Sequence, residues 1–197
     1  MDPARVSRKI MKKILLSLSA FLFCILTYAQ DMFSVSKGLV TFYSHAPIED
    51  ITAENKQPGS MINMVTRDIA VIIPIRNFKF AKELMQEHFN EKYLESEKYP
   101  MASFKGVIAD DVDLTKDGEF QTSAKGVISI HGVEKEMTLT GTLKRSGNSI
   151  SLVSDFKIAI KDFKITVPKL LFENIAEVID VHVALDYKPF QKPSSSK

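Results

Sequence analysis

The sequence predicts an all-β protein, a single antiparallel sandwich or barrel of about eight or nine strands with one short helical insertion. Apolar residues alternate with polar ones along most segments, which is the period of a half-buried strand. The segments are short and separated by polar turns. Strands do not alternate regularly with helices, which argues against a doubly wound parallel sheet.

The first 29 residues predict a secretory signal peptide. Lys12 and Lys13 precede an apolar run from Ile14 to Leu26, and the small residue Ala29 follows it at the expected cleavage site. The run is shorter than the roughly 20 residues of a membrane-spanning helix. We therefore expect a periplasmic or secreted protein whose mature chain has no membrane span. Because Met11 begins a compact signal peptide of its own, the residues before it can also be an upstream extension.

Charge and cysteine content change when this segment is removed. Five of the 26 basic residues and one of the 24 acidic residues precede position 30, which leaves 21 basic and 23 acidic residues and a net charge of −2. A nucleic-acid-binding surface is therefore not expected. The only cysteine, Cys24, lies in the apolar run. The mature chain then forms no disulfide, and its stability must come from packing.

Five strands are predicted in the N-terminal half of the mature chain. Polar turns separate them, of which Pro58-Gly59 is the clearest. They are expected at Phe33–Tyr43, Ile51–Asn55, Met61–Val65, Ile69–Ile75 and Ala102–Asp110.

One segment, Phe78 to Leu94, has helical periodicity instead. Its apolar side recurs at Phe80, Leu84, Met85, His88 and Phe89. A short amphipathic helix is predicted here, ending or bending near Asn90. Its apolar residues Phe80, Leu84 and Phe89 are candidates for a lid over a barrel mouth, or they pack on the outside of the barrel.

The C-terminal half predicts four more strands, followed by a flexible tail at 191–197. His131-Gly132-Val133 forms the turn between the first two. The strands are expected at Phe120–Ile130, Met137–Leu143, Ile150–Ile160 and Ile179–Tyr187. The folded domain is thus expected to span 30–190.

Two blocks resemble the YceI-like family. Gly126 to Leu139 resembles its strand-turn-strand pattern G-x-L-x-I-H-G-V-x-K-x-V-x-L, and His88 to Phe104 resembles its helix followed by a Y-P-x-x-x-F strand entry. The resemblance implies a single exported, lipocalin-like β-barrel of about eight strands. In some members the lumen holds a polyisoprenoid or another long-chain amphiphile. The family's early H-x-x-x-S-x-V-x-G-x-F block is represented only by His45 and Ile51–Asn55, so shorter early strands and a different lumen are expected.

A long apolar chain needs a dry tunnel, because each buried methylene contributes roughly 0.8 kcal/mol and hydrogen bonds are needed only at the head. The same apolar residues can equally fill a solid core. The candidate lining residues are Phe104, Phe120, Ile128, Leu139, Phe156, Ile158, Val181 and Val183.

Motifs for chemistry are weak. The histidines, His45, His88, His131 and His182, lack the spacings of metal ligands, and His131 is expected to be a turn residue bonded to the backbone. The acids Asp110, Asp111, Asp113 and Asp117 fit a solvated hairpin turn better than a calcium loop. Hydrolase and nucleotide-binding signatures are absent from the sequence.

The sequence thus predicts a non-enzymatic exported protein that binds a long-chain lipid, such as a polyisoprenoid or fatty-acid-like molecule, without cofactor or metal. A homodimer is compatible with it. The alternative is an exported structural or stress-related interaction protein with a filled barrel. A third hypothesis is an enzyme that acts on a hydrophobic substrate. The sequence shows no clear combination of a nucleophile with a general base that would support it.

Overall fold

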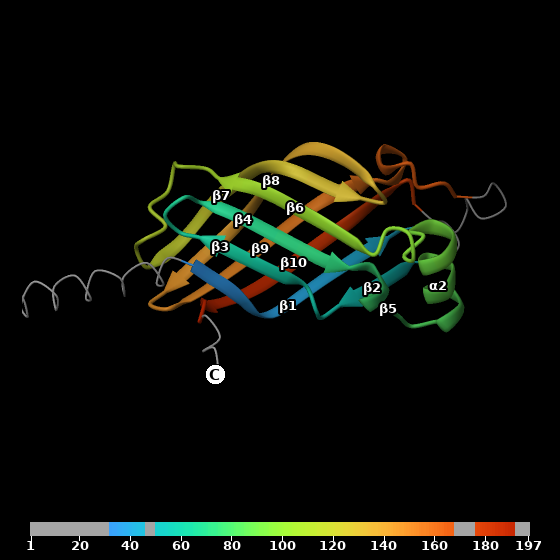
Figure 1. Ribbon diagram of the computed structural model, residues 1–197, viewed down its shortest axis with the longest axis horizontal. Helices are drawn as coiled ribbons and strands as arrows, with labels where there is room; N and C mark the ends of the chain where they lie inside the picture. The colour runs from blue at the N-terminus through green and yellow to red at the C-terminus, as the bar shows by residue number, and fades with distance from the viewer. Residues whose placement is uncertain (1–31, 46–49, 168–175, 192–197) are drawn as a thin grey trace, which may run out of the picture.

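The computed structural model describes residues 32–45, 50–167 and 176–191. These form one ten-stranded sheet with a small helical region at one end (Figure 1). The strands are β1 (Met32–Ser44), β2 (Ile51–Asn55), β3 (Gly59–Asn63), β4 (Asp68–Pro74), β5 (Lys79–Phe80), β6 (Met101–Ile108), β7 (Gly118–Ile130), β8 (Val133–Ser146), β9 (Ser149–Ala159) and β10 (Val178–Pro189). The predicted signal peptide with Cys24, and the predicted tail beyond residue 191, lie outside the described residues.

Eight of these strands close into an antiparallel barrel, which confirms the predicted fold class. The order around the barrel is β1, β10, β9, β8, β7, β6, β4 and β3, and β3 returns to β1. The first and last strands pair from Phe33 with Pro189 to Tyr43 with Asp180, with one bulge after Val35. This pairing of distant segments closes the sheet on itself.

The remaining strands, β2 and β5, extend the sheet at one end. Strands β2 and β3 both pair with the same edge of β1. β3 pairs with residues Met32–Ser34 of β1, and β2 pairs with its residues Val40–Ser44. Asn55, the last residue of β2, is fully buried, and its Nδ2 donates to the carbonyl of Pro74 at 2.8 Å. β2 and β3 are five residues each, whereas β1 has 13.

The helix is shorter than predicted. Helix α2 spans only Glu83–His88, and a wider π-helical turn, Phe89–Tyr93, follows it. Lys79 and Phe80 were expected to be helical, but they form β5 because they pair with β2. Pairing with the edge of β2 therefore outweighs the helical periodicity of the local sequence.

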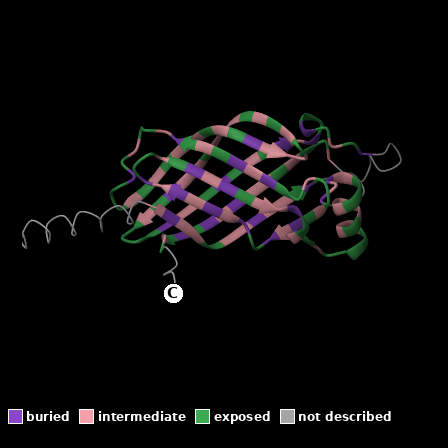
Figure 2. Ribbon diagram, viewed as in Figure 1, coloured by how far each residue is buried: buried purple, intermediate pink, exposed green. Residues whose placement is uncertain are grey.

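Burial follows the strand period. Along β8, odd-numbered residues are sheltered and even-numbered residues other than Thr142 are exposed, so that one set faces the barrel interior. Figure 2 shows the same alternation on the neighbouring strands, whereas α2 is largely exposed. The barrel interior is therefore mainly apolar, whereas the outer face carries polar side chains together with a few exposed apolar ones, such as Val107 and Val127.

The barrel end opposite α2 is solid. The loop at 109–117 folds back over it and places Leu114 in the interior, where only 1% of the residue is exposed. Two arginines hold this loop: Arg67 donates to the carbonyls of Ala109 and Val112, and Arg145 donates to the carbonyl of Leu114 at 2.9 Å. The acids of this loop are exposed, as predicted, but the hairpin also closes the barrel.

A buried tyrosine connects three strands at the same end. The Tyr187 hydroxyl donates to Ser60 Oγ at 2.7 Å, and Ser60 donates in turn to the carbonyl of Ala70. Burial raises the pKa of Tyr187 well above its usual value. β10, β3 and β4 are therefore joined by hydrogen bonds inside the apolar core.

Candidate functional site

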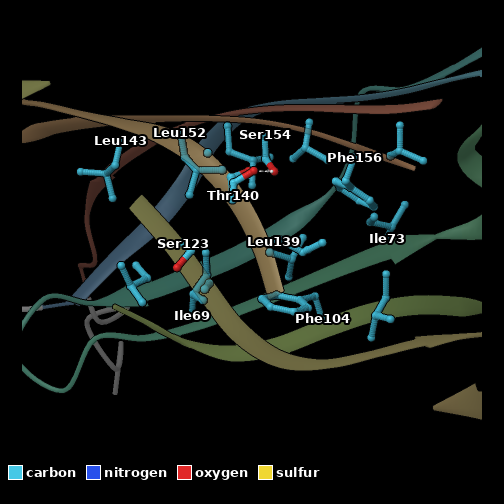
Figure 3. Close-up of a pocket in the computed structure, with 18 of the residues that line it drawn as sticks. Ile69, Ile73, Phe104, Ser123, Leu139, Thr140, Leu143, Leu152, Ser154 and Phe156 are labelled. Carbon is cyan, nitrogen blue, oxygen red and sulfur yellow. Dashed lines mark hydrogen bonds between the residues drawn. The ribbon is translucent and has the colours of Figure 1, made fainter. Parts of the chain in front are cut away.

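An apolar cavity, here called the inner cavity, lies inside the barrel. It encloses about 130 Å³ and is lined by strands β4, β6, β7, β8, β9 and β10. Figure 3 shows Phe104, Leu139 and Phe156 among its walls. Of the residues that line it, all within the described part of the chain, none carries a titratable side chain. Such a lining suits an apolar chain.

The structure brings nearly all of the candidate lining residues to this cavity. Those that line it are Phe104, Ile128, Leu139, Phe156, Ile158, Val181 and Val183. Phe120 does not line it. It lies nearer the solid end, where its ring packs against Gly118.

The Ser154 hydroxyl interrupts the apolar lining where β8 meets β9. Ser154 Oγ donates to the carbonyl of Thr140 at 2.6 Å, and both residues line the inner cavity (Figure 3). Ser154 was missed as a site residue, although the sequence holds a signal. It is the polar member of the otherwise apolar inward series Ile150, Leu152, Phe156 and Ile158.

The β8–β9 seam is paired over only part of its length. Thr142–Ser146 pairs with Ser149–Val153, and the ladder stops there, although β8 continues back to Val133 and β9 continues to Ala159. By contrast, β7 pairs with β8 from Gly118 to Ile130. Gly141 lies one residue beyond the last pair, Thr142 with Val153, and a side chain there would come within 2.6 Å of the Val153 carbonyl oxygen.

A second apolar cavity, the outer cavity, lies between α2 and the end of the barrel. It encloses about 280 Å³. The lid candidates Phe80, Leu84 and Phe89 all line it, together with Phe42 of β1. Burial raises the pKa of Tyr93, whose side chain also borders this cavity. The polar residues at its wall are few, namely Ser44 of β1 and His88 and Tyr93 of the helical region.

Four phenylalanine rings pack together beside the outer cavity. Phe42 stacks on Phe89 with ring centroids 5.5 Å apart, and Phe80 approaches Phe89 at 5.0 Å. Phe78 contacts both Phe42 and Phe89. This aromatic cluster joins β1, β5 and the helical region. We therefore expect α2 to depend on these few aromatic contacts for its position.

His131 ties three segments together at this end. Its Nδ1 lies 3.1 Å from the carbonyl oxygen of Phe163, and its Nε2 lies 2.8 Å from Glu95 Oε2. The ring packs edge-on against Tyr99, with centroids 4.6 Å apart. His131 is therefore the backbone-bonded turn histidine that the sequence predicts, with an additional carboxylate partner.

The sequence matches the model of the YceI-like domain over residues 29–187, which is most of the chain. The chain belongs to the YceI-like family. No curated protein shows a significant sequence match.

Solved structures share this YceI-like fold at low sequence identity. A polyisoprenoid-binding domain from Saccharophagus degradans, implicated in plant cell wall breakdown, aligns with a TM-score of 0.70 at 15% identity, over 80% of this chain and 98% of its own. BcnA from Burkholderia cenocepacia aligns with a TM-score of 0.61 at 14% identity, over 76% and 95%. The YceI protein of Campylobacter jejuni aligns with a TM-score of 0.60 at 15% identity, over 75% and 90%.

Two other histidine–carboxylate pairs of this YceI-like domain lie on its surface. His45 and His182 contact Asp50 and Asp155 at 2.6 and 2.7 Å, and all four side chains are at least 44% exposed. Within the residues that the structure describes, no three His, Cys, Asp or Glu side chains are grouped as a metal site. In the same residues no helix is long and apolar enough to span a bilayer.

Proposed function

We propose that this protein is an exported, non-enzymatic binding protein that holds a long-chain amphiphile, a polyisoprenoid or fatty-acid-like lipid, by its apolar chain. The observation that carries this proposal is the pair of apolar cavities, one inside the barrel and one between the barrel end and α2. Ile179 of β10 lines the outer cavity, and Val181, two residues along the same face, lines the inner one. The two spaces therefore follow one another along the barrel wall.

The energetics favour an apolar ligand. Each methylene moved from water into these cavities contributes roughly 0.8 kcal/mol, so that a chain of several methylenes binds without any specific hydrogen bond. A polar head is best placed beside α2, where His88 and Tyr93 border the outer cavity and water is near.

Two further observations support the proposal. The first 29 residues have the charge and apolar pattern of an export signal. A relative of the same fold is a polyisoprenoid-binding domain. Export also brings the protein to a compartment in contact with membrane lipids, where a carrier of such a ligand would meet it.

Native mass spectrometry, combined with solvent extraction of the purified exported chain, tests this function. A co-purifying amphiphile in stoichiometric amount is the expected result, and its mass identifies the ligand class. If the folded protein stays empty after incubation with polyprenyl and fatty-acid mixtures, the binding role is wrong. The interaction protein with a ligand-free barrel then becomes the better hypothesis.

A matched pair of variants tests whether the ligand occupies the inner cavity. Ala124 lines the inner cavity, and its neighbour Lys125 is exposed on the outer face of β7. Ala124→Leu fills space in the cavity and should reduce the bound fraction of lipid, whereas Lys125→Leu should leave it unchanged. Equal lipid content in the two variants would place the ligand elsewhere.

A further inference from the structure

Part of the β8–β9 seam has no ladder pairing. Continuing the register of the paired part would set Leu139 opposite Phe156 and Met137 opposite Ile158, but no ladder joins these residues. Leu139 and Phe156 both line the inner cavity. We call the stretch between residues 136–139 of β8 and 155–159 of β9 the window.

Polar contacts close the window at both ends. At the end nearer the β8–β9 hairpin, Ser154 donates to the carbonyl of Thr140. At the other end, Lys135 Nζ lies 2.7 Å from Asp162 Oδ2 in the 3-10 turn Ile160–Phe163, which directly follows β9. The two strands are therefore held at fixed points, and the stretch between them is free to separate without loss of ladder hydrogen bonds.

The inner cavity alone is too small for a long chain. At about 130 Å³ it is close to the roughly 150 Å³ that accommodates one benzene molecule. A chain of several isoprene units is much larger, so most of it must lie outside this space. The alternative path leads through the outer cavity, past the packed aromatic cluster of Phe42, Phe78, Phe80 and Phe89.

We propose that the apolar chain of the ligand enters and leaves the lumen through the window between β8 and β9. This inference rests on the proposed lipid-binding function. The window adjoins the inner cavity directly, its edges carry Leu139 and Phe156, and separation of the strands there breaks no ladder pair. A flexible chain passes through such a slot one segment at a time, whereas entry beside α2 requires the aromatic rings to move apart.

A chemical staple across the window tests the route. Thr138 and Lys157 are exposed positions that face each other in the continued register, and Thr138 and Lys125 are a true pair in the β7–β8 ladder. Cysteines replace these residues in a full-length Cys24→Ser background, as Thr138→Cys with Lys157→Cys and as Thr138→Cys with Lys125→Cys. A flexible bismaleimide then links each pair, and the unlinked proteins serve as internal controls.

Stopped-flow fluorescence with cis-parinaric acid measures association and dissociation. Stapling the window should slow both rates about tenfold or more and change the dissociation constant little, because a barrier is raised while the end states stay the same. Stapling the paired β7–β8 seam should change neither rate. Circular dichroism of the linked proteins checks that both remain folded.

The outcomes separate this inference from the function on which it rests. If the unmodified protein binds no cis-parinaric acid and no polyprenol, both are wrong. If it binds the probe and the window staple leaves the rates unchanged, the route is wrong and the function stands. Rates that respond to Phe89→Ala but not to the staple would place the entrance beside α2.

Removing the ion pair gives an opposite perturbation. Lys135→Ala frees one end of the window and should raise both rates about two- to fivefold, the effect expected from one partly exposed ion pair. Lys144→Ala breaks a comparable exposed pair with Glu119, which spans the fully paired β7–β8 ladder, and should have no effect. Equal rates in the two variants would contradict the route.

Discussion

The two ends of the barrel differ in how the chain closes them. At one end Phe33, Leu114 and Tyr187 are each about 1% exposed, and arginine side chains fix the covering loop to the barrel. At the other end α2 covers a cavity of about 280 Å³, and Leu84 of this helix is 61% exposed. Packing density therefore falls from one end of the barrel to the other.

This difference suggests a division of roles along the barrel axis. We expect close packing at the solid end to contribute most of the stability. The loosely packed α2 end leaves room for a ligand at a smaller contribution to stability, which is typical of binding regions.

Leu114→Ala should have the largest effect on stability. It removes a fully buried side chain from the solid end and should lower the free energy of unfolding by about 2–5 kcal/mol. Urea denaturation measures this. Leu84→Ala at the α2 end is the matched control and should change the free energy of unfolding by about 0.5 kcal/mol or less. Equal losses in the two variants would remove the proposed difference between the ends.

Hydrogen exchange should respond to ligand only at the α2 end. Amides from Lys79 to Asn90 should exchange quickly in the free protein, and excess ligand should slow them by up to about 100-fold at a concentration 100 times the dissociation constant. Amides of β3, which lines neither cavity, should change much less. Protection of α2 that is already complete without ligand would contradict the lid role of Phe80, Leu84 and Phe89.

His131→Ala should destabilise the α2 end moderately. It removes the hydrogen bonds to Phe163 and Glu95, and the expected loss is about 1–3 kcal/mol in the free energy of unfolding. His182→Ala removes an exposed contact with Asp155 and should have little effect on thermal stability. Unchanged stability of His131→Ala, with loss of ligand, would instead assign His131 to the binding site.

The smallest effect is expected from pH at the solid end. Hydrogen bonds from Thr115 and contact with Lys116 lower the pKa of Asp113 to about 2. Because the folded-state pKa is depressed, this carboxylate stabilises its loop fully above about pH 4 and loses that effect as the pH falls towards 2. NMR titration of the loop amides measures this, and Asp113→Asn should abolish the transition. A transition that persists in Asp113→Asn belongs to another group.

The sequence predicted those parts of the fold that depend on local periodicity. Alternation placed the strands from Phe120 to Tyr187 close to their observed positions, because a half-buried strand repeats every two residues wherever it lies. The resemblance to the YceI-like family then selected a barrel instead of a sandwich. The same alternation pointed most of the candidate lining residues inward, since one face of each strand must be apolar.

Long-range contacts decided the rest. Lys79 and Phe80 became a strand because β2 offered an edge, and Leu114 closed the barrel because Arg67 and Arg145 hold its loop. Neither pairing is visible in a local pattern.

The cavities and the window also belong to the tertiary structure. The sequence shows which residues face inward, but the space left between them depends on how eight strands pack together. Phe120 faces inward and still lies outside the inner cavity. The point at which β8 and β9 separate depends on the backbone partners that each strand finds across the barrel, which its own side chains do not specify.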